Sequence, residues 1–106
     1  MAMKILHALK YFKYKKYDPS WLVDASKSYI DEYPWLPDAI SKCTLALEGK
    51  NYIRFVSSIR PNKPSSEWQF RENIILEDTI EGDVILDILH GDRIGGVEFY
   101  IRRFKK

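Results

Sequence analysis

DVILDILHGDRIGGVEFY, residues Asp83 to Tyr100, is the stretch of sequence that decides the fold. Apolar side chains alternate with other residues over Val84–Leu89 and again over Val97–Arg102, which is typical of strands that bury one face. Gly91 can supply the left-handed residue of a tight turn, and so short a connection requires antiparallel pairing. Gly95-Gly96 predicts a bulge where the second strand begins. The stretch therefore predicts a β-hairpin.

Two further strands are predicted upstream of this hairpin, over Tyr52–Ile59 and Trp68–Leu76, because both runs are rich in β-branched and aromatic residues. The segment RPNKPSSE, Arg60–Glu67, separates them, and its prolines and serines indicate a surface connection. Together these runs predict an antiparallel meander of about four strands in the C-terminal part of the chain.

A helix is predicted over Pro19–Tyr33, where apolar residues recur at helical spacing. Asp18 can cap its first turn, and Pro34 ends it. Residues 3–14 fit either a helix or an edge strand.

A second helix is preferred over Pro37–Gly49, because proline suits the start of a helix and glycine its end. The same residues also fit a strand, since Cys43, Leu45 and Leu47 alternate and could pair with the following strand through a turn at EGKN. The prediction is one α+β domain, residues 1–106, with N-terminal helices packed on the C-terminal sheet.

Charge is unevenly distributed along a chain of 106 residues whose net charge is only +2. Residues 1–16 hold five lysines and no acid, and residues 93–106 are also strongly basic. From Glu72 to Asp92 there is no lysine or arginine, although seven carboxylates occur there. Their number exceeds what solubility requires, so they indicate either a solvated face or a docking surface for a basic partner.

The residues that could carry chemistry are few, and no catalytic, metal or cofactor site is predicted. Cys43 has apolar neighbours, as an inert core thiol does, and His7 and His90 do not supply a zinc ligand set. The single cysteine and the absence of a long apolar run favour a cytoplasmic protein. A hydrolase built on paired carboxylates is the least favoured reading, so we expect no enzyme and no small-molecule substrate.

The segment SSEWQFRENIILEDTIEGDVILDILHGDRIGGVEFY, residues 65–100, resembles the strand–turn–strand ending of short bacterial domains of unknown function. Proteins of this size and composition include immunity proteins of the contact-dependent growth inhibition type, which bind and block a cognate toxin. The resemblance implies a cytoplasmic protein that neutralises a basic toxin, often a nuclease. The basic overall pI is a departure, because inhibitors of nucleases are more typically acidic throughout.

The partner-binding residues expected on this reading are six carboxylates and two aromatic anchors: Glu77, Asp78, Glu81, Asp83, Asp87, Asp92, Trp68 and Trp35. Toxic nucleases are basic because their substrate is polyanionic, so carboxylates can complement their phosphate-binding residues. The alternative reading is a small nucleic-acid-binding or regulatory domain that uses the basic N- and C-terminal segments, where KYFKYKKY interleaves lysine with aromatic residues.

Overall fold

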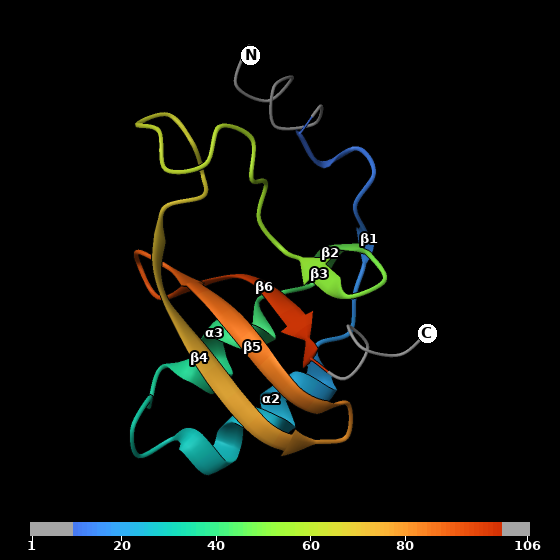
Figure 1. Ribbon diagram of the computed structural model, residues 1–106, viewed down its shortest axis with the longest axis vertical. Helices are drawn as coiled ribbons and strands as arrows, with labels where there is room; N and C mark the ends of the chain where they lie inside the picture. The colour runs from blue at the N-terminus through green and yellow to red at the C-terminus, as the bar shows by residue number, and fades with distance from the viewer. Residues whose placement is uncertain (1–9, 101–106) are drawn as a thin grey trace.

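The fold is a twisted antiparallel sheet with helices on one face, as the computed structural model describes it for residues 10–100 (Figure 1). Six strands follow the order β1-β2-β3-β6-β5-β4. The α+β class is confirmed, but the prediction of about four strands is wrong because the short strands β1 and β2 extend the sheet beyond β3. The elements are β1 (Lys15–Lys16), α2 (Ser20–Ser26), η1 (Lys27–Tyr29), α3 (Leu36–Ser41), β2 (Leu45–Glu48), β3 (Tyr52–Arg54), β4 (Phe70–Thr79), β5 (Gly82–Leu89) and β6 (Arg93–Phe99).

The first predicted helix is present but shorter than expected. After α2 the chain tightens into the 3₁₀ turn η1, where the Ser26 hydroxyl donates to the carbonyl of Val23 at 2.7 Å. Serine side chains that bond to nearby carbonyls compete with the regular helix, which accounts for the early end. Asp18 accepts the amide of Ser20 at 3.0 Å, and this bond lowers the pKa of its carboxyl.

The segment Pro37–Gly49, for which a helix was preferred, divides into α3 and β2. The strand alternative is correct for its second half, because β2 pairs with β3 and the amide of Gly49 closes the turn on the carbonyl of Tyr52 at 2.8 Å. Of the ambiguous residues 3–14, residues 3–9 lie outside the described part of the chain, residues 10–11 are helical, and β1 follows as an edge strand.

The long hairpin predicted from Asp83–Tyr100 is confirmed as β5 and β6. Gly91 and Asp92 both have positive φ, 84° and 56°, so both residues of this tight turn lie in the left-handed region. The register shifts between Asp87 and Ile88, so Gly95 is the extra residue of the predicted bulge. β3 is shorter than predicted because the amides of Phe55 and Val56 both turn to the carbonyl of Gly95.

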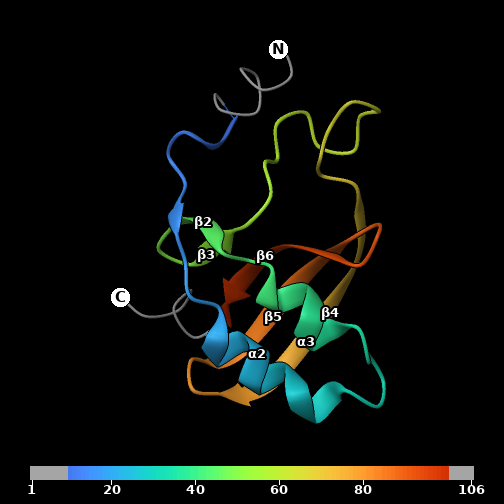
Figure 2. The same ribbon diagram turned by 180° about the vertical axis from the view of Figure 1, so that it is seen from behind.

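The core lies between the sheet and its helices, and Figure 2 shows α2 and α3 in front of the sheet. Leu22 of α2 and Leu36 of α3 are fully buried in the same core cluster as Val84 and Leu86 of β5. Trp21 stacks on Phe99 of β6 with ring centroids 5.8 Å apart. No described helix covers the opposite side of β4, β5 and β6 (Figure 1), which we call the outer face.

Candidate partner-binding site

The outer face is defined by two rows of residues that pair across the strands. One row joins Asn73, Asp87 and Gly96, and the neighbouring row joins Ile75, Ile85, Glu98 and Tyr52. Ile75 is 54% exposed near the middle of β4, the edge strand of the sheet, where it pairs with Ile85 of β5. The outer face therefore presents an apolar centre with carboxylates beside it, a composition suited to contact with another macromolecule.

A hydrogen-bond network fixes one side of the outer face. The Tyr52 hydroxyl donates to Oδ2 of Asp87, and Nδ2 of Asn73 donates to Oδ1 of the same carboxylate at 2.6 Å. Burial, and then the bond to Asp87, raise the pKa of Tyr52 well above its usual range. Asp87 thus acts as a shared acceptor that ties together β3, β4 and β5.

The two consecutive glycines of β6 make room for aromatic rings. A Cβ on Gly96 would lie 2.2 Å from the Tyr52 hydroxyl, and one on Gly95 would lie 2.7 Å from the Trp68 ring. Neither glycine has a positive φ, so space, rather than turn geometry, requires them. The Arg54 guanidinium lies 5.6 Å from the centroid of the Tyr52 ring and extends this aromatic layer.

The turn between β4 and β5 gathers acidic side chains around an apolar tip. We call residues 77–83, which include Glu77, Asp78, Glu81 and Asp83, the acidic hairpin. Ile80 at its tip is 83% exposed, the largest exposed fraction among the described apolar side chains. Sequence reasoning missed Ile80, because a lone isoleucine between predicted strands carries no signal of its own.

Local hydrogen bonds hold the acidic hairpin in one conformation. Asp83 accepts the amide of Asp78 at 2.9 Å, and the Thr79 hydroxyl both donates to the carbonyl of Gly82 and accepts the amide of Glu81. The amide of Glu77 donates to the Tyr29 hydroxyl at 2.8 Å, which links the hairpin to η1. Such a turn loses little further conformational freedom when it binds a partner.

The six predicted carboxylates do not form one cluster. Four of them lie in the acidic hairpin, and Asp87 lies farther along β5 in the network on the outer face. Asp92 lies at the opposite end of β5 and pairs with Arg71 at 2.7 Å. Within the described residues, Glu77, Asp78 and Asp83 form no ion pair with a lysine or arginine.

The two predicted aromatic anchors are both half-buried within the fold. The Trp68 ring covers Gly95, and Trp35 lies under the Arg71 guanidinium at 5.2 Å and beside Tyr33. A role for either tryptophan in partner binding stays a prediction.

No arrangement typical of nucleophilic or metal chemistry occurs in residues 10–100. Burial raises the pKa of the Cys43 thiol to about 12, which keeps it protonated and unreactive at neutral pH. His90 is exposed on the β5–β6 turn. The described histidines, cysteine and carboxylates nowhere converge in a group of three or more that could hold a metal ion.

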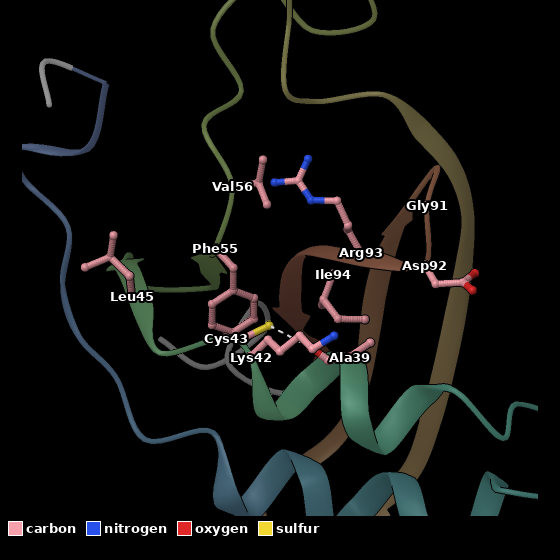
Figure 3. Close-up of a pocket in the computed structure, with 10 residues that line it drawn as sticks. All are labelled: Ala39, Lys42, Cys43, Leu45, Phe55, Val56, Gly91, Asp92, Arg93 and Ile94. Atoms are coloured by element: carbon pink, nitrogen blue, oxygen red, sulfur yellow. Dashed lines mark hydrogen bonds between the residues drawn. The ribbon is translucent and has the colours of Figure 1, made fainter. Parts of the chain in front are cut away.

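A pocket of about 310 Å³ opens beside the C-terminal end of α3 (Figure 3). Its lining comes from α3 and the link to β2, from the start of β2, from the residues after β3, and from the β5–β6 turn with the start of β6. Cys43, Phe55 and Ile94 belong to its apolar part, and Lys42 and Arg93 bring positive charge. The pocket and the acidic hairpin lie at opposite ends of β5, so they are separate features.

Comparison of the chain with protein-family models, with curated proteins and with solved structures gave no significant match. In the described range, none of the helices has the length and apolar character needed to span a membrane.

Proposed function

We propose that this chain is an immunity protein: it binds a cationic protein toxin of the nuclease class and blocks it stoichiometrically, without catalysing a reaction. The observation that carries the proposal is the acidic hairpin, which holds four carboxylates around the exposed Ile80 on a hydrogen-bonded turn. A nuclease presents cationic side chains where it contacts phosphates, so the hairpin is complementary to such a cleft in charge.

The exposed Ile80 at the tip of the acidic hairpin would supply affinity that charge alone does not. Burying an isoleucine side chain contributes about 1.5–3 kcal/mol, whereas exposed ion pairs contribute about 0–1 kcal/mol each. Ile80 would therefore provide affinity, while the surrounding carboxylates would speed association and select a basic partner.

The outer face supplies the remaining contact area. A stable protein interface buries about 800 Å² on each partner, more than one hairpin turn offers. The acidic hairpin continues directly into the outer face along β4 and β5, where Ile75 is exposed beside Ile85. One partner surface could therefore contact the tip and the outer face together.

Co-expression with a panel of basic nuclease toxin domains, scored for rescue of bacterial growth, tests the proposal. The test variant combines Glu77→Lys with Ile80→Ser, and the matched control combines Glu48→Lys with Ile59→Ser at exposed positions elsewhere. The wild-type chain and the control should rescue growth against at least one toxin, and the hairpin variant should not. Rescue by the hairpin variant, or the lack of rescue against every toxin in the panel, would contradict the proposal.

Nucleic-acid binding is a second candidate function, supported by basic and aromatic side chains at the β1 edge of the sheet. Lys15 and Lys16 of β1 are exposed, and Arg54 stacks on Tyr52 two strands away. This reading predicts an affinity for single-stranded oligonucleotides that falls steeply with salt and is lost on Lys15→Glu with Lys16→Glu. The immunity proposal predicts that this double variant still rescues growth.

A further inference from the structure

The pocket beside α3 combines a buried apolar floor with a cationic rim. Cys43, Phe55, Val56 and Ile94 line it, and each of these side chains is less than a tenth exposed. They come from three separate segments of the chain that meet here (Figure 3). A ligand in this pocket would therefore lie directly against the edge of the core.

The charges around the pocket are positive because its only acidic lining residue points away. The Asp92 carboxylate accepts a hydrogen bond from Nη1 of Arg71 at 2.7 Å, and Figure 3 shows it directed away from the pocket. The positive φ values of Gly91 and Asp92 set this turn, after which the Arg93 side chain extends toward Val56. The Asp92 carboxylate is therefore bound to Arg71 outside the pocket, whereas the Arg93 side chain lies across the pocket.

Of the two cationic side chains at the pocket, Arg93 is better placed than Lys42 to bind an anion. Lys42 pairs with Asp38 at 3.3 Å, whereas within the described residues Arg93 forms no ion pair. Burial raises the pKa of the Cys43 thiol, and the positive charge of Arg93 lowers it by a smaller amount. This effect agrees with a guanidinium that faces the pocket. An anion placed beside Arg93 would therefore meet guanidinium donors that no described carboxylate engages.

We propose that this pocket binds a small organic anion with an apolar body, namely an aliphatic monocarboxylate. The carboxylate would accept hydrogen bonds from Arg93, and the chain would lie on Phe55 and Ile94. A volume of about 310 Å³ suits a ligand of this size, at the lower end of the range for small-molecule sites. Binding is non-covalent, because the Cys43 thiol stays protonated at neutral pH.

Titration of the ¹⁵N-labelled chain with hexanoate, 1-hexanol and acetate, followed by amide chemical shifts, tests this site. Hexanoate should bind with a Kd on the order of 1 mM and shift amides of residues 42–45, 55–56 and 91–94. Hexanol lacks the charge and acetate lacks the chain, so both should bind about tenfold or more weakly.

Two arginine variants separate the guanidinium from general charge. Arg93→Gln should weaken hexanoate binding about tenfold and leave hexanol binding unchanged. Arg60→Gln, at an exposed position outside the pocket, should change neither. The proposal would be overturned if hexanoate and hexanol bound equally, or if only residues outside the pocket shifted. It would also be overturned if hexanoate did not bind at about 10 mM, or if Arg93→Gln kept the full affinity for hexanoate. These results are independent of growth rescue, since the acidic hairpin lies at the other end of β5.

Discussion

Replacing Gly96 by alanine should strongly destabilise the protein, although the change adds a single methyl group. The new Cβ would lie 2.2 Å from the Tyr52 hydroxyl and 2.5 Å from two ring carbons, so the ring must move by about 1 Å or more to reach ordinary contact. That movement breaks the hydrogen bond from Tyr52 to Asp87. Overpacking costs about 1–3 kcal/mol, and loss of a hydrogen bond to a charged group costs about 1.5–3 kcal/mol. Alanine also reduces the conformational entropy of the unfolded chain, which stabilises the fold by about 0.4–1 kcal/mol. The free energy of unfolding should fall by about 2–5 kcal/mol.

Urea denaturation followed by tryptophan fluorescence measures this change, and a double-mutant cycle assigns its cause. In a Tyr52→Ala background the ring is gone, so Gly96→Ala should cost little or become stabilising. Gly91→Ala is the control: its φ is 84° and nothing lies within 4 Å, so it should cost only about 1–2 kcal/mol of backbone strain, whether or not Tyr52 is present. An equal cost of Gly96→Ala in both backgrounds would refute the role assigned to the Tyr52 ring.

Three further outcomes are expected. Burial raises the pKa of the Cys43 thiol from 9.0 to about 12 in the folded state, so the unfolded chain loses this proton at a lower pH than the folded chain does. The free energy of unfolding should therefore fall by about 1.4 kcal/mol per pH unit above pH 9. Urea titrations across alkaline pH measure this slope, and Cys43→Ala should remove the part that is due to the thiol. Leu86→Ala should lower the free energy of unfolding by about 2–5 kcal/mol in the same assay, because the Leu86 side chain of β5 is fully buried in the core. Ile80→Ser should change the free energy of unfolding by less than about 0.5 kcal/mol, since this side chain is 83% exposed, and a larger loss would mean that the tip supports the fold.

The hairpin of β5 and β6 could be predicted because its evidence is local. Alternation over Val84–Leu89, the turn glycine Gly91 and the bulge at Gly95 are all encoded within a few residues of one another. The structure of the segment Pro37–Gly49 could not be predicted from local sequence, because its first half does form a helix and its second half does form a strand. Pairing of β2 with β1 and β3 decided where the helix ends, and those partners lie elsewhere in the sequence.

The candidate site was harder to predict than the fold, because closeness in sequence is not closeness in space. Asp83 and Asp92 lie in one run of acids, but the extended strand between them spans roughly 25 Å, and they end on opposite turns. The Gly95-Gly96 pair predicted a bulge, but nothing near it in sequence identifies Tyr52 as the residue that approaches Gly96. The pocket was missed because residues of four segments line it.

The structure also changes which substitutions can test the docking surface. Charge reversal at Asp83 and Asp87, two of the six predicted carboxylates, would break the hydrogen bonds that they accept from the Asp78 amide and the Tyr52 hydroxyl. Glu77→Lys is a cleaner perturbation, because the Glu77 side chain is exposed and only its backbone amide bonds to Tyr29. Glu48 of β2, an exposed strand glutamate outside the acidic hairpin, provides the matched control.

The association rate constant between the chain and a nuclease toxin domain that it neutralises tests the central claim most directly. Measured by stopped-flow fluorescence at low ionic strength, Glu77→Lys should slow association about tenfold, and the difference should shrink as salt shortens the screening length. Glu48→Lys should associate at nearly the wild-type rate. Equal slowing by both substitutions, or no slowing by Glu77→Lys, would contradict docking through the acidic hairpin.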